Sequence, residues 1–217
     1  MSSKQYFDEV ASQWEEMRAA FFSEAVREKA ISLARVEPGK VAADIGAGSG
    51  FVTEGLIREG LRVIAVDQSE AMLDEMRNRF SHRDDVEYRL GEAENLPIAD
   101  ATVDHVFANM YLHHVESPPE AIKEMVRVLK PGGRLVITDL DEHTFEFLRT
   151  EQQDRWLGFQ RKDVQRWFEE AQLLNVMTDG VGESCCAQSS QGDAEASVSI
   201  FVACGERGLA QRRGGGD

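Results

Sequence analysis

Long apolar runs, basic residues and cysteines are all scarce in this sequence of 217 residues. No apolar stretch approaches the roughly 20 residues that a membrane-spanning helix needs, so we expect no membrane span. The first residues, Met1–Gln5, lack the basic region followed by an apolar segment that marks a protein for secretion. We therefore expect a cytoplasmic protein.

The shortage of basic residues limits the possible partners. The chain has 24 Lys and Arg against 39 Asp and Glu, a formal net charge of −15. Nucleic-acid binding draws much of its affinity from Lys and Arg that release counterions from phosphates, so we expect no nucleic-acid partner. Cys185, Cys186 and Cys204 are an odd number of cysteines, which suits reduced thiols better than a disulfide framework.

Apolar residues make up 42% of the chain and are spread along it, as in a chain that buries a full core. We expect one domain over residues 1–205. Residues 206–217 include three consecutive glycines and have little to bury, so we predict a disordered tail there. The sequence does not indicate the oligomeric state.

Short apolar runs alternate with helical patterns through the first two thirds of the chain. The runs that we predict as strands are 41–45, 62–66, 86–90, 103–108 and 135–138. Ser69 is a good N-cap for the helix after the second strand. Ser117-Pro118-Pro119-Glu120 has the form of a capping box, and we expect Pro131-Gly132-Gly133 to end the helix that it starts. This alternation indicates an α/β fold with a mainly parallel sheet and helices on both faces.

The flanks of this region have other patterns. Residues 6–34 are rich in helix formers, and a charged and aromatic stretch, 141–159, precedes a helical pattern around residues 164–171. Two further strands are expected around residues 174–177 and 196–203, with a polar loop between them that holds Cys185 and Cys186.

Glycines and carboxylates stand where the first two strands end. Gly46, Gly48 and Gly50 permit a tight turn and a close approach of the backbone to a ligand, with helix N–H groups nearby. Asp67 ends the second strand about 20 residues later, where an acid accepts hydrogen bonds from a ribose. These features predict a nucleoside site. A dinucleotide fold favours G-x-G-x-x-G, but Phe51 follows the early third glycine, which argues against a nicotinamide-dependent dehydrogenase.

The sequence resembles the class I S-adenosylmethionine-dependent methyltransferases between about residues 41 and 139. The segments that carry the resemblance are 44–50 (DIGAGSG), 65–69 (AVDQS), 91–97 (GEAENLP) and 127–135 (RVLKPGGRL). The branch that it resembles comprises small-molecule enzymes related to quinone-biosynthesis C-methyltransferases and to those fused to arsenic-responsive repressors. The resemblance implies a Rossmann-like, doubly wound, mainly parallel seven-stranded sheet with an antiparallel C-terminal hairpin. It also implies that S-adenosyl-L-methionine is the cofactor.

The same resemblance implies which residues contact the cofactor. They are Tyr6, Asp44, Gly46, Ala47, Gly48, Asp67, Gln68, Glu92, Ala93 and Asn109. The glycine loop would pack against the methionine part and the ribose, while Asp67 would hold the ribose hydroxyls. Glu92 and Ala93 would contact the adenine beside Gln68, and Asn109 would lie near the methionyl group. Asp44 would fix the loop or accept from the ligand ammonium.

Tyr6, Trp14 and Arg18 match the N-terminal segment that folds over the cofactor in this family, so residues 1–35 would form a helical lid. The alternative is that these residues only pack helices together and do not contact the cofactor. Residues 140–172 would form a helical segment on the acceptor side.

Methyl transfer from a sulfonium is an in-line displacement, in which positioning of the small-molecule acceptor supplies much of the acceleration. A base is needed only where the acceptor must lose a proton, and His or a carboxylate is the usual choice. The candidates are His114, Asp141 and His143. The alternative for His113 and His114 is a structural role. The alternative for Asp141 and His143 is capping of the next helix. Phe145, Phe147, Trp156 and Phe159 are candidates for the wall of an apolar acceptor pocket.

The adjacent thiols of Cys185 and Cys186, with Cys204 as a third ligand, suggest a site for a soft ion such as trivalent arsenic. Their spacing matches no structural zinc pattern, and cysteines also serve as small buried apolar residues, so we assign no other metal site. Methylation of trivalent arsenic is therefore one alternative to a small organic acceptor. A noncatalytic module that binds S-adenosylmethionine is another.

Overall fold

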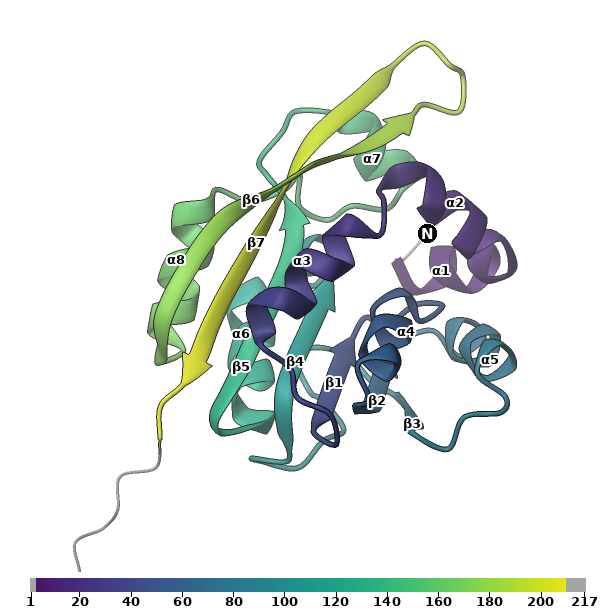
Figure 1. Cartoon of the computed structure of the whole chain (residues 1–217). Helices are drawn as coiled ribbons and strands as arrows, with labels where there is room; N and C mark the ends of the chain where they lie inside the picture. Colours follow the sequence, from purple (N-terminus) through teal and green to yellow (C-terminus); the bar gives the residue numbers. More distant parts are fainter. Residues whose placement is uncertain (1–2, 210–217) are drawn as a thin grey trace, which may run out of the picture.

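A computed structural model describes residues 3–209 of the chain. Five strands form parallel pairs through most of the sheet (Figure 1). They are β1 (Val41–Ile45), β2 (Arg62–Asp67), β3 (Val86–Leu90), β4 (Val103–Asn109) and β5 (Leu129–Leu140). Apart from Val41, their valine, isoleucine and alanine residues are buried because helices cover both faces, which is typical of parallel sheets.

The complete sheet has seven strands in the order β3-β2-β1-β4-β5-β7-β6. β7 (Glu195–Arg207) runs antiparallel between β5 and β6 (Leu173–Gln188), so β6 and β7 form a C-terminal hairpin. The strand order reverses at β1, between β2 and β4, where a ligand crevice is expected in a fold of this type. The predicted α/β fold is thus confirmed, including its antiparallel hairpin.

Helices cover the sheet in two layers. α3 (Ala25–Ala34), α4 (Phe51–Arg58) and α5 (Glu70–Arg79) lie on one face, and α6 (Pro118–Val128) and α8 (Arg161–Glu170) lie on the other. Each layer has its own apolar core, one centred on residues such as Val26 and Leu56 and the other on Ile122 and Phe168. The polar ends of the strands are therefore free to form a site at the edge between the layers.

Two helix starts are made in different ways. Ser69 Oγ accepts a hydrogen bond from the N–H of Met72 at 3.1 Å, which confirms the predicted N-cap of α5. Ser117 is the N-cap residue of α6, but among the described residues its side chain makes no capping hydrogen bond. The predicted capping box is wrong: within the described chain the Ser117 side chain makes no capping bond, Pro119 has no N–H to offer, and the N–H of Ser117, which Glu120 would cap, is bound elsewhere. The carboxylate of Glu94 instead accepts from the N–H groups of Glu116 and Ser117.

The end of α6 also differs from the prediction. The helix ends at Val128, and Pro131-Gly132-Gly133 lies within the long strand β5. The pairing of β4 with β5 shifts register between Val103 and His105, so the glycine segment is absorbed as an irregularity of the strand.

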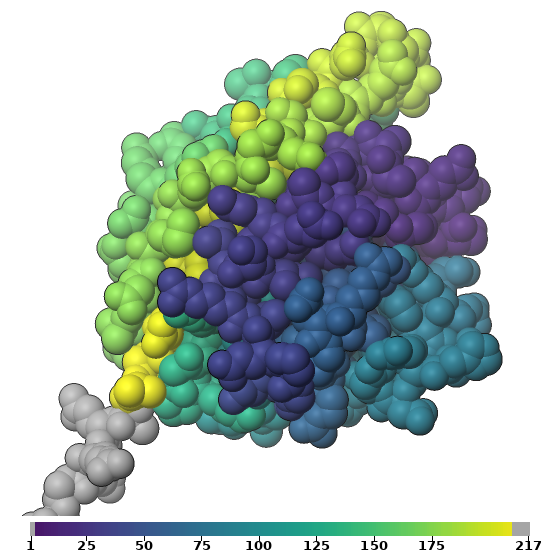
Figure 2. Space-filling model, viewed as in Figure 1, coloured from purple at the N-terminus to yellow at the C-terminus, as the bar shows by residue number. Residues whose placement is uncertain are grey.

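The N-terminal region divides into two parts. α1 (Ser3–Val10), the 3-10 turn η1 (Ala11–Gln13) and α2 (Trp14–Phe21) lie over the carboxyl ends of the strands, and Phe22 is extended. α3 then packs on the sheet. In Figure 2 this N-terminal region fills the space between the β6–β7 hairpin and the helices α4 and α5. Within the described part of the predicted lid, residues 3–22 lie over the strand ends and α3 packs on the sheet.

Two C-terminal predictions are corrected. Cys185 and Cys186 lie within β6, paired with Val198 and Ser197 of β7, and not in a loop. The hairpin is longer than the apolar pattern suggested. In its outer half, buried and half-buried residues occupy one face and the alternate polar residues face solvent, so no continuous apolar run marks it. The predicted tail overlaps the end of β7 at residues 206 and 207, and residues 210–217 lie outside the described residues.

Two short helices complete the described chain, the 3-10 turn η2 (Leu112–His114) and α7 (Glu146–Glu151). Between residues 3 and 209, none of the helices has the length and apolar character needed to cross a membrane.

Candidate active site

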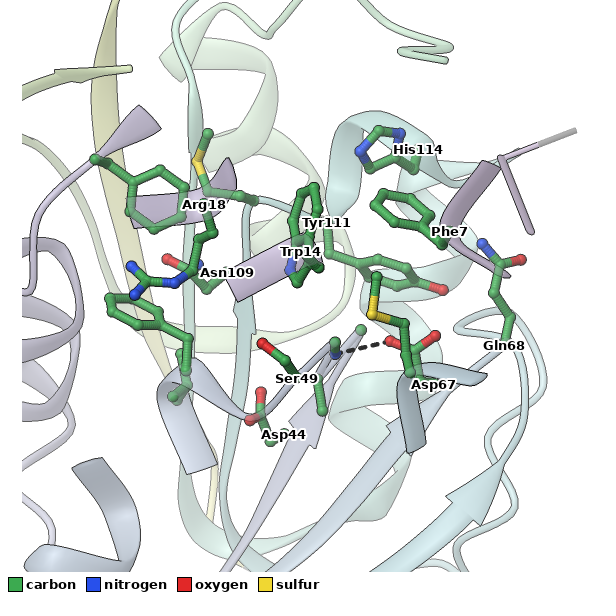
Figure 3. A pocket seen from close by; sticks show the side chains of 18 residues that line it. Phe7, Trp14, Arg18, Asp44, Ser49, Asp67, Gln68, Asn109, Tyr111 and His114 are labelled. Atoms are coloured by element: carbon green, nitrogen blue, oxygen red, sulfur yellow. Dashed lines mark hydrogen bonds between the residues drawn. The ribbon is translucent and has the colours of Figure 1, made fainter. Parts of the chain in front are cut away.

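The loop after β1 is tied to the end of β2. The N–H groups of Gly46 and Ala47 both donate to the carbonyl of Val66, at 2.9 and 3.1 Å. The N–H of Gly48 donates to Asp67 Oδ2 at 2.8 Å, a bond drawn in Figure 3. Gly46 and Gly48 have φ values of 67° and 53°, a region that favours glycine. The backbone of this loop is therefore fixed before any ligand binds.

Asp67 is buried at the strand end. Its Oδ1 accepts from the N–H of Ser69 at 2.9 Å, so each carboxylate oxygen holds one backbone N–H. Burial raises the pKa of Asp67, and the backbone hydrogen bonds oppose that rise. A carboxylate has about four acceptor positions, so Asp67 can still accept from a ligand hydroxyl.

Asp44 stands at the end of β1, beneath the loop. Its Oδ2 accepts from both the N–H and the hydroxyl of Thr53, at 2.9 and 2.7 Å. Burial raises the pKa of Asp44 to about 6, and the nearby charge of Asp67 adds to the rise. Asp44 thus anchors the start of α4 with one oxygen and lines a pocket with the rest of its side chain.

We call this hollow the inner pocket. Its predicted members are Trp14, Arg18, Asp44, Gly46, Ala47, Gly48, Asp67, Gln68, Asn109 and His114. Figure 3 shows them arranged around one space between the strand ends and the N-terminal helices. Asn109 accepts a hydrogen bond from the Thr138 hydroxyl at 2.7 Å, which orients its amide. The cavity is about 50 Å³, far below the roughly 300 Å³ of a small-molecule pocket, because aromatic side chains fill much of the space.

Arg18 comes to this pocket from α2. Its side chain is almost fully buried, and the guanidinium carbon lies 4.1 Å from the centroid of the Phe51 ring. One nitrogen donates to Glu15 at 2.5 Å, whereas Nε has no partner within the described part of the chain. A buried guanidinium with spare donors is suited to an anionic ligand group.

Tyr111 was not predicted as a site residue. It is buried in the inner pocket, directly against Gly46, where a Cβ would come within 2.2 Å of the Tyr111 ring. Gly46 is therefore required by a tyrosine of the protein itself. The signal that was available is the position of Tyr111 just after β4, at the same sheet edge as the other strand ends.

The N-terminal segment is bonded to the polar loops below it. Glu15 accepts from the Ser49 hydroxyl at 2.7 Å, and Asp8 accepts from the Ser69 hydroxyl at 2.6 Å. On the opposite side, the Tyr6 hydroxyl donates to Gln152 Oε1 at 2.8 Å. These bonds tie residues 6–15 to loops that follow β1 and β2 and to the region after α7.

A second hollow, which we call the apolar pocket, adjoins the first. It lies between α1, α2, the region after β5, and β6. Its lining includes Tyr6, Phe21, His113, Leu140, Leu148, Gln152, Asp154, Cys185 and Ala187. Phe7, Trp14, Phe22, Met110 and His114 line both pockets. The two pockets therefore share one wall of side chains.

Two buried histidines lie near this wall in different protonation states. His113 Nδ1 lies 2.7 Å from Asp139 Oδ1, and its Nε2 lies 3.7 Å from Asp154 Oδ1. Burial lowers the pKa of His113, but the two carboxylates outweigh it and raise the pKa to about 9. Burial and the neighbouring His113 cation hold the pKa of His114 well below its usual range. His114 is therefore neutral near pH 7.

The remaining predicted residues lie farther away. Tyr6 reaches the apolar pocket and not the inner one, and Glu92 is exposed in a separate surface hollow with Gln68. Ala93 is buried behind Tyr111, to which its backbone is hydrogen-bonded. The proposed contacts of Glu92 and Ala93 with adenine are not formed by the inner pocket as it stands.

Two of the candidate bases are not brought to either pocket. Asp141 binds Arg161 through both oxygens, at 2.7 and 2.6 Å. His143 Nδ1 accepts from the N–H of Phe145 at 3.3 Å, and burial is the main cause of its lowered pKa. Neither residue is the N-cap of α7, which is Phe145. Of the aromatic residues proposed to wall the pocket, Phe145 and Phe147 pack on the α3 side and Phe159 belongs to the core of the other face.

The three thiols do not converge. Cys185 and Cys186 are consecutive strand residues, whose side chains point to opposite faces. Cys204 is buried opposite Met177, many residues along the hairpin, with its thiol near the Leu33 carbonyl. Burial raises the pKa of Cys185 to about 12, so its thiol stays protonated. The predicted three-thiol ligand set is therefore wrong, and only Cys185 lines the apolar pocket.

Comparison with known proteins agrees with this geometry. Residues 43–137 match the family described as a methyltransferase domain. The demethylmenaquinone methyltransferase of Renibacterium salmoninarum is 39% identical over 113 residues, which is 52% of this chain and 46% of that enzyme. The chain spans less than half of the length of the first curated relatives that it matches.

Solved structures share the fold over nearly the whole chain. The protein in complex with the Haloferax volcanii Trm112 methyltransferase activator has a TM-score of 0.77 at 20% identity, covering 93% of this chain and 97% of that one. The [4+2]-cyclase SpnF has a TM-score of 0.76 at 13% identity, covering 97% and 98%. A cyclase among the neighbours shows that the fold alone does not set the reaction. The family match and the relative nevertheless agree with the motifs at residues 44–50 and 65–69, so residues 43–137 are similar to the methyltransferase domain family, in line with the resemblance to the class I S-adenosylmethionine-dependent type.

Proposed function

We propose that this protein transfers a methyl group from S-adenosyl-L-methionine, bound in the inner pocket, to a small-molecule acceptor in the apolar pocket. The observation that carries the proposal is the shared wall of Phe7, Trp14, Phe22, Met110 and His114. In-line displacement requires the acceptor atom, the methyl carbon and the sulfur to lie on one line. Two adjoining pockets that share a wall support this proposal, because a ligand in each would bring the methyl group and the acceptor atom to the same wall.

The cofactor would be held from three directions. Asp67 would accept from the ribose hydroxyls, and Asp44 with Asn109 would face the methionyl end. The buried guanidinium of Arg18 would bind the methionyl carboxylate from above, which gives the lid a direct part in cofactor binding. Phe7, Trp14 and Tyr111 would have to shift, because the present cavity of about 50 Å³ is too small for the cofactor.

The acceptor would be apolar and at least partly aromatic. The second pocket is lined mainly by aromatic and aliphatic side chains, and the Renibacterium relative is named for a menaquinone precursor. We therefore infer an acceptor of quinol or phenol type. Of the three predicted bases, His114 alone lies against both pockets, so we assign it the contact with the nucleophilic atom.

Calorimetric titration with S-adenosylmethionine, S-adenosylhomocysteine and NAD tests the cofactor without knowledge of the acceptor. We expect both sulfur ligands to bind and NAD not to bind. Asp67→Ala should weaken binding by roughly 1–3 kcal/mol, because ribose hydroxyls would lose a buried acceptor. Asp74→Ala is the matched control, since Asp74 is exposed on α5, away from the inner pocket, and the change should leave affinity unchanged. Equal affinities in the two variants would contradict the site.

Turnover separates an enzyme from a binding module. Incubation with S-adenosylmethionine and a set of quinols and phenols should release S-adenosylhomocysteine with at least one acceptor. Tight cofactor binding without product from any acceptor would favour the noncatalytic alternative. For the arsenical alternative, arsenite is added as an acceptor and Cys185→Ser is compared with the exposed Cys186→Ser; loss of arsenite methylation in the first variant alone would support it.

A further inference from the structure

Three buried side chains converge at the wall of the apolar pocket. One ring nitrogen of His113, one ring nitrogen of His114 and one carboxylate oxygen of Asp154 all lie within 4.8 Å of one another. All three residues line that pocket. Two imidazoles and a carboxylate are a ligand set that zinc and iron(II) sites use.

One nitrogen of each ring already has a hydrogen-bond partner. His113 Nδ1 lies 2.7 Å from Asp139 Oδ1, a buried carboxylate, so this nitrogen carries one hydrogen of the cation. Nε2 is directed to Asp154 and carries the other, which metal binding would displace to solvent. His114 Nδ1 lies 3.3 Å from the carbonyl of Gln153, which can only accept, so its Nε2 keeps a lone pair. Metal-binding histidines nearly always have such a partner on the second nitrogen, because it fixes the tautomer and the ring orientation.

The spacing is close to that of an occupied site. Bonds of about 2.0–2.2 Å in a tetrahedral arrangement place two ligand atoms about 3.3–3.6 Å apart. His113 Nε2 and Asp154 Oδ1 are 3.7 Å apart, and the widest pair of the cluster is within 4.8 Å. Binding would have to draw the widest pair together by about 1 Å. Soft thiolate ligands are absent from it, which separates it from the predicted cysteine site.

We propose that His113, His114 and Asp154 form a site for one divalent transition-metal ion, with Zn²⁺ as the first candidate, whose open coordination position faces the apolar pocket. Aspartate and two imidazoles disfavour Mg²⁺ and Ca²⁺, which take oxygen ligands. The site itself is independent of the methyltransferase reaction; its use in that reaction rests on the proposed function.

When the site serves methyl transfer, His114 would bind the metal ion, and the metal ion would contact the acceptor. An acceptor hydroxyl would coordinate in the open position and release its proton to solvent, because a divalent ion lowers the pKa of bound oxygen. The resulting oxygen anion would form the new C–O bond while the S–CH₃ bond breaks, and the electron pair of that bond would stay on sulfur in neutral S-adenosylhomocysteine. For an aromatic carbon acceptor, the same oxygen anion would direct the electron pair to the ring carbon.

The test measures metal binding to the full-length protein after removal of metal with a chelator. Zn²⁺ titration by calorimetry should show one site, and Co²⁺ should give the visible absorption bands of a four- or five-coordinate ion without a thiolate charge-transfer band. Asp154→Asn should weaken Zn²⁺ binding by at least about tenfold, and Asp139→Asn by about 10–100-fold through the outer contact. His143→Gln is the control, because this imidazole lies outside the cluster and should leave Zn²⁺ affinity unchanged.

The outcomes are distinct. Absence of Co²⁺ bands and of Zn²⁺ binding in the unaltered protein would overturn the proposal, and this result needs no variant to fold. Equal Zn²⁺ affinity in Asp154→Asn, in His114→Gln and in the control would also overturn it, as would a thiolate band that Cys185→Ser removes. Because the titration is made without S-adenosylmethionine, a metal site in a protein that binds no cofactor would contradict the proposed function only.

Discussion

The inner pocket and the apolar pocket adjoin, yet different kinds of interaction hold them in shape. The inner pocket rests on backbone: two loop N–H groups bind the Val66 carbonyl and a third binds Asp67. The apolar pocket is made of side chains from α1, α2, η2, the region after α7 and β6. A loop whose backbone conformation requires glycine accepts few substitutions. A pocket lined by side chains from several elements changes its shape with single substitutions. We therefore expect the first to fix the cofactor and the second to set the acceptor.

The most severe way to break the inner pocket is Gly46→Ala. A Cβ at this position would lie 2.2–2.8 Å from atoms of the Tyr111 side chain, in a backbone conformation with φ of 67°. Strain and overpacking together should lower the free energy of unfolding by roughly 2–5 kcal/mol. Denaturant unfolding followed by circular dichroism measures the change.

Gly192→Ala is the matched control for Gly46→Ala. Gly192 has a similar φ of 70°, but a Cβ there would meet nothing within 4 Å. Backbone strain alone should cost about 1–2 kcal/mol. Equal losses in the two variants would show that Tyr111 does not constrain the loop.

Arg18→Met tests whether the lid contributes to the cofactor pocket. Met keeps apolar contact with Phe51 but removes the buried guanidinium, which we assign to the methionyl carboxylate. A charge-assisted hydrogen bond is worth about 1.5–3 kcal/mol, so S-adenosylmethionine should bind roughly 10–150-fold more weakly. Calorimetry against 5′-methylthioadenosine, which lacks the amino-acid part, is the control, and its affinity should be unchanged. A parallel loss for both ligands would assign Arg18 to packing alone.

Asp44 provides a pH-dependent test of the same pocket. Burial raises its pKa to about 6 in the unliganded protein, whereas a ligand ammonium favours the ionised carboxylate. Affinity for S-adenosylmethionine should therefore be constant just above pH 6 and fall as pH decreases through 6, by at most about tenfold per pH unit. Asp44→Asn should abolish this dependence. A sloping profile in that variant would assign the titration to another group.

The same shift has the opposite sign for stability without ligand. Because the folded-state pKa of Asp44 is raised, its contribution to stability is fully present below about pH 4 and is lost as pH rises through about 6. The unliganded protein should accordingly lose stability relative to Asp44→Asn over this interval, measured by thermal unfolding at several pH values.

The smallest expected effect concerns the apolar pocket. Tyr6→Phe removes the hydroxyl that donates to Gln152, a bond worth about 0.5–1.5 kcal/mol. Burial raises the pKa of Tyr6 to about 12, so the hydroxyl is present as a donor at neutral pH. Amide hydrogen exchange in α1 should accelerate by a few-fold to about tenfold. Ser23→Ala, which removes an exposed bond to Glu183, should leave exchange in α1 as it was.

The two pockets also differ in how far the sequence predicted them. Asp44, Gly48 and Asp67 were identified because strand ends meet at one edge of a parallel sheet, so their spacing along the chain fixes their place in space. Asp154 and Gln152 stand in an irregular segment without periodicity, and their meeting with Tyr6 and His113 depends on tertiary packing. Such contacts leave no local pattern in the sequence.

The errors have the same origin. Ser117 and the prolines after it matched a capping motif, but the N–H of Ser117, which that motif would pair with Glu120, is bound by Glu94. Cys185 and Cys186 appeared to be neighbours on a loop, whereas pairing with β7 turned their side chains to opposite faces. Asp141 had the right chemistry and the right position in the chain, but Arg161 engages it. In each case a distant residue decided the outcome.

Residues 3–22 wall both pockets and are bonded to loops on either side of them. Under the proposed function, both ligands would pass this one segment, and its opening would break the bonds of Glu15, Asp8 and Tyr6 together. The residence times of cofactor, product and acceptor are then set by a single opening event. Turnover by such an enzyme would reach a ceiling that is common to all its acceptors, however fast the chemical step, and would slow with solvent viscosity.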